Sequence, residues 1–262
     1  TPFGMKLYTD GVLVIDITAV ETENGSVTPA EKAGIKKGDY ILSADGKNIH
    51  TNEELSAAVE ASGGNKIKLI VKRNGKKKTV YISPVISKET ESLKIGLWVR
   101  DSSAGIGTMT FYSPLTGVVC GLGHGVCDED TGELLSLDTG ELVTAEIIAV
   151  EKGSTGNPGQ LKGKFTNGSI GAIDKNCENG VYSILKGKIN PSNLIEIALK
   201  QEIKDGAAQI LCTIDGSTPK LYGCKIKKRS SAYLSAAQNL TVTVTDKDLL
   251  DKTGGIVQGM SG

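Results

Sequence analysis

The chain of 262 residues is long enough for one large domain or two ordinary ones, and its 39% hydrophobic and 23% charged residues are typical of a globular protein. Because thirty basic residues balance thirty acidic ones, net charge gives no pull toward nucleic acid or an anionic membrane. No apolar run approaches the length of a membrane-spanning helix, and 33 glycines with only 4% aromatic residues favour a β-rich fold with many tight turns.

Residues 1–84 have the pattern of one small α/β module. The stretch VLVIDITAV (12–20) predicts an apolar strand, and residues 28–49 predict a short helix, a turn and a further strand. The first residues, TPFGMKLYTDG, contain neither a start methionine nor the regions of a signal peptide. We therefore expect a native N-terminal signal or anchor to lie outside this chain.

The second half of the module predicts a helix and a hairpin. TNEELSAAVEA (51–61) has apolar residues at helical spacing, with Thr51 or Asn52 as its N-cap. Two strand-like runs in residues 66–84 flank Asn74-Gly75, which is the strongest short signal for a β-hairpin.

The stretch AEKAGIKKGDYILSADGKNI (30–49) resembles the corresponding part of bacterial PDZ domains. By that resemblance, Phe3-Gly4-Met5 is the apolar-Gly-apolar loop whose backbone N–H groups bind a terminal carboxylate. Leu55 and Val59 would then line the groove in which a peptide adds as a strand. Each of these two residues is equally well explained as part of a helix core.

The remainder of the chain has the pattern of a second, all-β domain. A charged linker lies near residues 85–92, so we expect a PDZ domain over 1–88 and a second domain over 89–262. In the second domain, short apolar runs are broken by turns about every ten residues, which favours a β-sandwich or barrel.

The candidate catalytic residues are the two histidines and a serine that lies in a glycine-rich turn. His50 lies at a predicted turn of the first module, where exposure is the ordinary explanation, whereas His124 lies between glycines directly after an apolar strand. Ser261 lies in Gly259-Met260-Ser261-Gly262, where backbone N–H groups can converge to bind an oxyanion. A G-x-S-G turn alone is a weak signal, but a base and a nucleophile in this order match the chymotrypsin arrangement.

A third group should orient the imidazole of the histidine. From the residues alone, the strand-end positions Asp246 and Asp215 lead, while Asp128, Asp174 and Asp248 compete with them. The five cysteines form no C-x-x-C pair, and the two histidines have no ligand spacing. We therefore expect no metal site and no cofactor.

Three stretches resemble the SpoIVB peptidase domain, the S55 family of serine peptidases from endospore-forming bacteria. They are WVRDSSAGIGTMTFYSPLTGVVCGLGHGVCDEDTG (98–132), AEIIAVEKGSTGNPGQLKGKF (145–165) and TDKDLLDKTGGIVQGMSG (245–262). The resemblance implies a mainly β fold in which a PDZ domain precedes a chymotrypsin-like double β-barrel. The family pattern continues past Gly262, so we expect the end of the domain to lie beyond this chain.

The same resemblance assigns roles to residues. It implies that His124 is the general base, that Asp246 is the orienting carboxylate and that Ser261 is the nucleophile of a serine endopeptidase. The backbone N–H groups of Gly259 and Ser261 would form the oxyanion hole.

The resemblance further implies a signalling role in sporulation. By that resemblance, the peptidase is expected to be secreted from the forespore into the space between forespore and mother cell. There the peptidase is expected to cleave itself and then a partner in a membrane complex that triggers processing of a late sigma-factor precursor. Two alternatives stay open on the residues alone: a non-catalytic, PDZ-containing interaction protein, and an esterase with the same triad.

Overall fold

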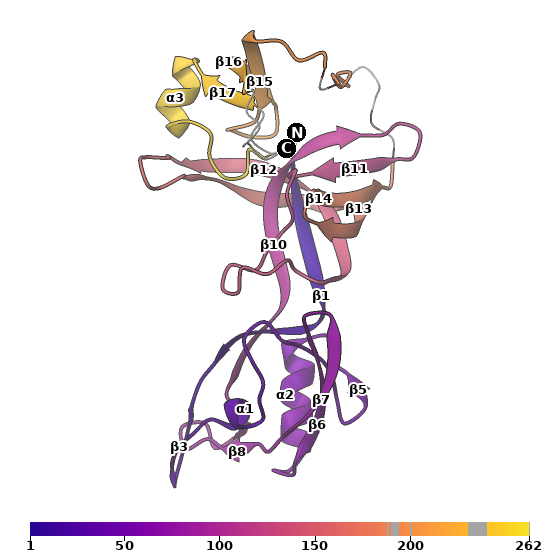
Figure 1. The fold of residues 1–262 in the computed structure, drawn as a ribbon, viewed down its shortest axis with the longest axis vertical. Coiled ribbons are helices and arrows are strands. Elements are labelled where there is room, and N and C mark those ends of the chain that lie inside the picture. The colour runs from indigo at the N-terminus through magenta and orange to yellow at the C-terminus, as the bar shows by residue number, and fades with distance from the viewer. Residues whose placement is uncertain (188, 190–193, 200, 230–239, 262) are drawn as a thin grey trace. The chain divides into compact units, whose positions relative to one another are not determined.

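The computed structural model describes residues 1–261 except 188, 190–193, 200 and 230–239. Strands hold 54% of the residues and helices 9%, so the fold is mainly β, as the turn-rich sequence predicted (Figure 1). The chain divides into two compact units. The large unit comprises Thr1–Lys6, Ala104–Gly125 and Glu141–Gly262, and the small unit comprises Leu7–Ser103 and Val126–Gly140.

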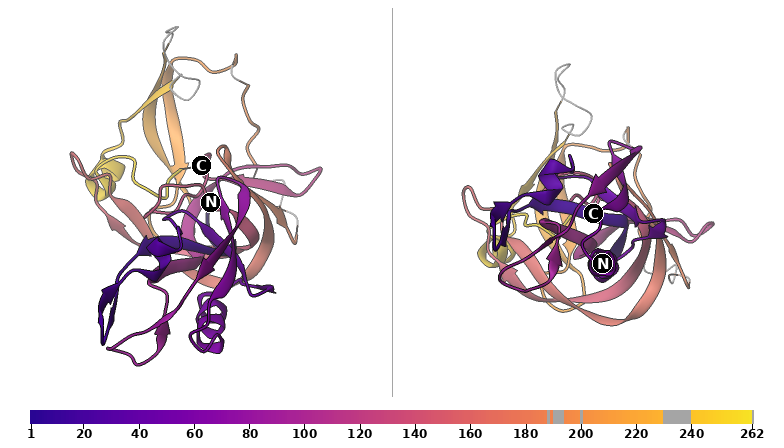
Figure 2. Two further views of the ribbon diagram at one scale, coloured as in Figure 1. Left: turned by 60° about the horizontal axis from the view of Figure 1, so that its bottom comes forward. Right: turned by 90° about the horizontal axis from the view of Figure 1, so that it is seen from below.

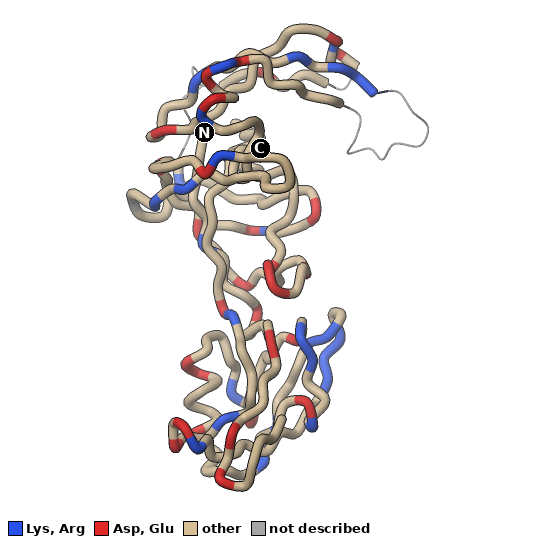
Figure 3. Tube along the Cα trace, turned by 90° about the vertical axis from the view of Figure 1, so that its left-hand side faces the viewer, with Lys and Arg blue, Asp and Glu red and all other residues tan. Residues whose placement is uncertain are grey.

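Three long strands belong to both units: β1 (Pro2–Ile17), β10 (Leu97–Tyr112) and β12 (Leu137–Glu151). The two units are therefore interleaved along the chain. The predicted boundary between residues 88 and 89 divides the chain into two consecutive sequence domains, which are defined differently from these units. It stays a prediction. Acidic and basic residues are interspersed throughout the fold, in line with their equal numbers (Figure 3).

The small unit has two helices and a sheet in which β1, β4, β6 and β7 are neighbours in that order, with β5 paired to β4. Its other elements are β2 (Val20–Thr22), β3 (Gly25–Val27), α1 (Pro29–Lys32), β4 (Tyr40–Ala44), β5 (Lys47–Asn48), α2 (Asn52–Ala61), β6 (Ile67–Arg73), β7 (Lys76–Ile82), β8 (Val85–Ile86) and β9 (Leu93–Lys94). The core lies between the sheet and α2, because buried side chains of β1, β4 and β6 pack with Leu55 and Val59.

Local sequence signals position these elements. The hairpin of β6 and β7 turns at Asn74 and Gly75, which have φ angles of 49° and 73°, and Arg73 pairs with Lys76. Two consecutive left-handed residues are what the tight hairpin turn requires, so the predicted hairpin is confirmed. Helix α2 begins with a capping box in which the Thr51 side chain accepts from the N–H of Glu54.

The small unit contains an ion pair with a buried carboxylate, between Asp39 and Arg73. The Asp39 side chain is fully buried, and its two oxygens accept from Nε and Nη2 of Arg73, both at 2.6 Å. Replacing Arg73 by alanine would leave a buried carboxylate without its cation, so we expect the free energy of unfolding to fall by about 3 kcal/mol. Urea unfolding of the wild type and the variant, followed by circular dichroism, measures this loss.

Lys88→Ala is the matched control, because Lys88 lies 3.9 Å from Glu23 and both side chains are exposed. Removing an exposed pair should change the free energy of unfolding by less than about 1 kcal/mol. A loss in Arg73→Ala as small as that of the control would contradict the structural role of the buried pair.

The large unit is built from a sheet of six neighbouring strands. In the order β10, β11, β14, β13, β12 and β1 each strand pairs with the next, and a further pairing of β10 with β1 joins the two ends. The elements not yet given are β11 (Val118–Gly121), β13 (Gln160–Cys177), β14 (Gly180–Leu185), β15 (Gly206–Cys212), β16 (Lys220–Lys228), β17 (Leu240–Val244) and α3 (Lys247–Thr253).

Irregular pairing lets this sheet curve. The register between β12 and β13 shifts at three places, and such bulges bend strands and raise their twist. The long salmon strands β12 and β13 curve strongly in Figure 2. Glycines allow close packing inside the curve, since a Cβ at Gly121 would collide with the ring of Phe3.

A second, three-stranded sheet lies in the same unit, in the order β15, β16 and β17. Its buried residues Cys212 and Tyr222 pack with Ile214, which lies between β15 and β16, and with Ile147 of β12 and Leu249 of α3 in one apolar cluster. The chymotrypsin-like double β-barrel that the resemblance implied stays a prediction.

Candidate active site

His124 lies in the loop that follows β11, and its ring is exposed. The ring atom Nδ1 is 3.0 Å from the carbonyl oxygen of Gly125. Because a carbonyl oxygen only accepts hydrogen bonds, this contact needs a proton on Nδ1, and in that tautomer the lone pair lies on Nε2. This is the tautomer that a general base acting through Nε2 requires.

The backbone just before His124 is strained. Leu122 has a φ angle of 70°, in the left-handed region that bulky side chains avoid. Leu122 is nevertheless well packed: it is buried, with 7% of its surface exposed, and its side chain lies so close to Gly107 that a Cβ there would collide with it. Packing therefore holds a conformation that costs about 1–3 kcal/mol, a pattern that clusters at functional sites.

Ser261 is half-buried and follows a turn at Gly259, whose φ angle is 93°. The N–H of Leu161 donates to the carbonyl oxygen of Gln258 at 2.8 Å, which fixes the peptide group that carries the N–H of Gly259. Within the described part of the chain, the N–H groups of Gly259 and Ser261 donate to no acceptor. Free backbone donors beside a serine are what an oxyanion hole needs.

Thr108 of β10 contacts both the serine turn and the histidine loop. Its N–H donates to the carbonyl oxygen of Ser261 at 3.3 Å, and its carbonyl oxygen accepts from the N–H of Leu122 at 3.1 Å. Its Oγ1 donates to the carbonyl oxygen of Gly259 at 2.9 Å. No hydrogen bond joins the ring of His124 to Ser261 in the residues described, so their catalytic roles stay predictions.

Asp246 is the N-cap of α3. Its Oδ1 accepts from the N–H of Leu249 at 3.1 Å, and its Oδ2 accepts from the N–H of Gly223 at 3.3 Å. The side chain is half-buried, and in the described structure it makes no hydrogen bond to His124. These hydrogen bonds explain Asp246 as the N-cap of α3. Its role in orienting the imidazole of His124 stays a prediction.

The competing carboxylates have other surroundings. The buried carboxylate of Asp128 is ion-paired with Arg100 inside the small unit. Asp248 pairs at 2.8 Å with a lysine one turn further along α3. Asp174 is exposed on β13, and Asp215 lines a pocket of the large unit.

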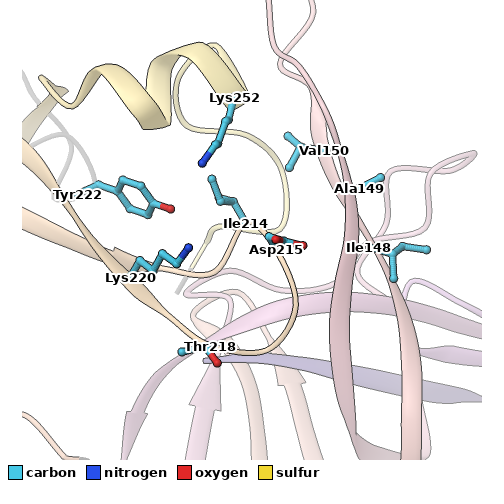
Figure 4. Close-up of a pocket in the computed structure, with 9 residues that line it drawn as sticks. All are labelled: Ile148, Ala149, Val150, Ile214, Asp215, Thr218, Lys220, Tyr222 and Lys252. Atoms are coloured by element: carbon cyan, nitrogen blue, oxygen red, sulfur yellow. The ribbon is translucent and has the colours of Figure 1, made fainter.

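That pocket has a volume of about 290 Å³ and does not include the three predicted catalytic residues. Its lining residues are Ile148, Ala149, Val150, Ile214, Asp215, Thr218, Lys220, Tyr222 and Lys252. Figure 4 shows the Tyr222 hydroxyl and the amino groups of Lys220 and Lys252 pointing toward the same space. Burial raises the pKa of the Tyr222 hydroxyl, and the hydrogen bond to Asp248 raises the pKa of Lys252. Both groups therefore stay protonated at neutral pH and offer hydrogen-bond donors.

Two buried thiols are poor rival nucleophiles. Burial raises the pKa of Cys120, four residues before His124, and also raises the pKa of Cys212. The thiolate is the reactive form of cysteine, so both side chains are largely unreactive at neutral pH.

The residues predicted to bind a peptide are all buried. Phe3, Gly4 and Met5 lie in β1 and belong to the large unit, where Phe3 is 1% and Met5 is 4% exposed. They form part of an extended strand where the resemblance implied a loop. Leu55 and Val59 are each 4% exposed in the core of the small unit, as the alternative explanation anticipated. Peptide binding by these five residues stays a prediction, and this placement does not favour it.

The segment formed by β9 and the first half of β10 contacts α2. The N–H of Leu93 donates to the Glu60 carboxylate at 2.9 Å, and the Asp101 carboxylate accepts from the N–H of Asn52 at 3.0 Å. Leu97 and Val99 pack against the core cluster that contains Leu55 and Val59. The hydroxyl of Thr9 in β1 donates to the carbonyl oxygen of Asp101 at 3.0 Å, so this segment contacts both the helix and the strand.

No helix in the described residues is long and apolar enough to cross a membrane. Within the same residues, no group of three or more His, Cys, Asp or Glu side chains is placed to hold a metal ion.

Fold and site together define a mainly β protein that joins a PDZ domain to a domain carrying a glycine-flanked histidine and a G-x-S-G turn. Comparison with protein families agrees with this class, since a PDZ domain matches residues 3–83. The family described as SpoIVB peptidase S55 matches residues 91–262, and the chain belongs to this peptidase family. The resemblance seen in the sequence is thereby confirmed.

Individual relatives match this chain either over a short stretch or at low sequence identity. Zinc metalloprotease RasP of Geobacillus kaustophilus is 27% identical over 180 residues, which is 65% of this chain and 36% of that protein. Serine protease HTRA1 of Xenopus laevis is 33% identical over 57 residues, which is 22% of this chain and 12% of that protein. The chain thus spans less than half the length of these curated relatives.

Among solved structures, the PDZ domain of an SdrC-like protein from Listeria monocytogenes is 24% identical. The match covers 34% of this chain and 87% of that domain, with a TM-score of 0.28.

Proposed function

We propose that this protein is a serine endopeptidase in which Ser261 forms the acyl-enzyme, His124 is the general base and Asp246 orients the imidazole. The observation that carries the proposal is the set of contacts at Thr108. That residue joins the turn of Ser261 to the loop of His124 through hydrogen bonds of its backbone. Membership of a peptidase family supports the reaction class.

The proposed reaction follows from the groups at the site. Oγ of Ser261 attacks a peptide carbonyl while Nε2 of His124 accepts its proton, and Asp246 accepts from Nδ1–H in place of the Gly125 carbonyl. The N–H groups of Gly259 and Ser261 stabilise the oxyanion. The imidazolium then gives its proton to the leaving amine. Water, deprotonated by His124, hydrolyses the acyl-enzyme in the second half of the reaction.

The biological role belongs to the same proposal. We infer that the peptidase acts in sporulation signalling, in the space between forespore and mother cell. There it cleaves itself and a partner of a membrane complex that controls a late sigma factor, and the PDZ domain contributes to recognition of a peptide. The family match supports this role. In a sporulating strain carrying Ser261→Ala, we expect sigma-factor processing to stop.

A fluorophosphonate probe tests the chemistry directly. We expect the full-length protein to be labelled at Ser261, located by mass spectrometry of the modified peptide, because only an activated serine attacks phosphorus at a useful rate. Ser261→Ala should show no label. Equal labelling of both forms would exclude Ser261 as the activated serine. Normal sigma-factor processing in the Ser261→Ala strain would favour the non-catalytic interaction protein.

A further inference from the structure

Thr108 provides three hydrogen bonds where the two catalytic loops meet, and its hydroxyl is the one side-chain group among them. Its backbone bonds reach Ser261 and Leu122, and its Oγ1 donates to the carbonyl oxygen of Gly259, 151 residues along the chain. We propose that Thr108 is a positioning residue of the peptidase, whose hydroxyl sets the backbone of the oxyanion turn. This inference rests on the proposed function and deepens it.

The hydroxyl acts on one specific peptide group. The Gln258–Gly259 peptide, which carries the N–H of Gly259, is fixed by the bond from the N–H of Leu161 to the carbonyl oxygen of Gln258. The next peptide, Gly259–Met260, is fixed from both sides. Its N–H donates to the carbonyl oxygen of Val257 at 3.2 Å, and its carbonyl accepts from Oγ1 of Thr108.

Holding these two peptides matters because a glycine lies between them. Gly259 has a φ angle of 93°, and glycine can rotate to other conformations at low cost. Rotation of the Gly259–Met260 peptide would redirect the chain that leads to the N–H of Ser261, the second oxyanion donor. A displacement of about 1 Å in such a group can cost about 10²-fold in rate.

The side chain of Thr108 is suited to this task. Threonine is β-branched and has few χ1 rotamers, and this residue is half-buried in β10, so little entropy is lost in aiming its hydroxyl. The backbone bonds of Thr108 persist in any variant at this position. Replacement of the side chain therefore tests the hydroxyl alone.

The experiment measures the rate of labelling by a fluorophosphonate probe in the full-length protein. Thr108→Val keeps the branched shape and Thr108→Ala removes it, but both lack the hydroxyl. We expect each to label about 10- to 100-fold more slowly than wild type, with the pH of half-maximal rate unchanged because His124 is untouched. Thr108→Ser, which keeps the hydroxyl, should label within about threefold of wild type.

Thr110→Val is the matched control, because Thr110 lies on the same strand and is exposed. It should label at the wild-type rate. Wild-type rates in Thr108→Val or in Thr108→Ala would overturn the inference, as would equally slow labelling in Thr108→Ser. If the wild type is not labelled at Ser261, the proposed function itself fails, and that result is distinct from a labelled wild type with an equally labelled Thr108→Val.

Discussion

Replacement of His124 by alanine is expected to lower kcat about 10⁶-fold, close to the full contribution of a catalytic triad. Without the imidazole, nothing removes the proton of Ser261 during attack, and nothing donates a proton to the leaving amine. Cleavage of fluorescein-labelled casein by the full-length protein, or hydrolysis of a simple ester where casein is a poor substrate, measures the loss.

Folding should be unaffected by this substitution. The His124 ring is exposed, and its hydrogen bond is to the neighbouring Gly125 carbonyl, so its removal leaves no buried group without a partner. His50→Ala is the matched control, since the chain has two histidines and His50 is also exposed. We expect the control to cleave at the wild-type rate. Activity of His124→Ala within about tenfold of wild type would exclude the proposed base.

Local signals in the sequence were sufficient for much of the small unit. The Asn74-Gly75 turn requires two left-handed residues, and Thr51 supplies the side-chain acceptor that the first turn of α2 needs. Both features depend on residues within a few positions of one another. They could therefore be predicted without knowing any tertiary contact.

Features that depend on distant residues were not predictable in this way. Phe3 was assigned to a peptide-binding loop, yet β1 continues through it because its ring fills the space beside Gly121. Thr108 carries no sequence signal at all, because its hydroxyl finds its partner 151 residues away. The stretch at 194–199 has the apolar alternation of a strand but forms neither helix nor strand, and Ile195 and Ile197 are each 76% exposed.

The residues of the candidate site likewise fall into those that local sequence signals identify and those that they do not. His124 stands out from the sequence because the chain has only two histidines and this one lies between glycines, and Ser261 stands out because it lies in a G-x-S-G turn. The catalytic roles of both residues stay predictions. The helix that Asp246 caps was not anticipated, since TDKDLLDKT is too short for its periodicity to separate it from a strand end. The role of Asp246 is consequently the part of the triad that most needs an experiment.

Asp246→Asn separates the two roles that this residue can have. Asparagine is as good an N-cap as aspartate, so Leu249 keeps its acceptor, although one oxygen cannot serve both Leu249 and Gly223. We expect the free energy of unfolding to fall by about 1 kcal/mol from the lost second bond. If Asp246 also orients His124, kcat should fall about 10⁴-fold, because an amide stabilises the wrong tautomer of the imidazole.

The size of the kinetic effect decides between the roles, because a lost cap bond cannot produce it. A 1 kcal/mol loss leaves nearly all molecules folded in a protein of ordinary stability, so it changes kcat very little. Asp248→Asn is the matched control: it lies two residues further on, is exposed, and its one ion pair among the described residues is with Lys252. It should keep wild-type kcat. A kcat for Asp246→Asn within about tenfold of the control would leave Asp246 as a helix cap alone, and His124 would then act without this carboxylate.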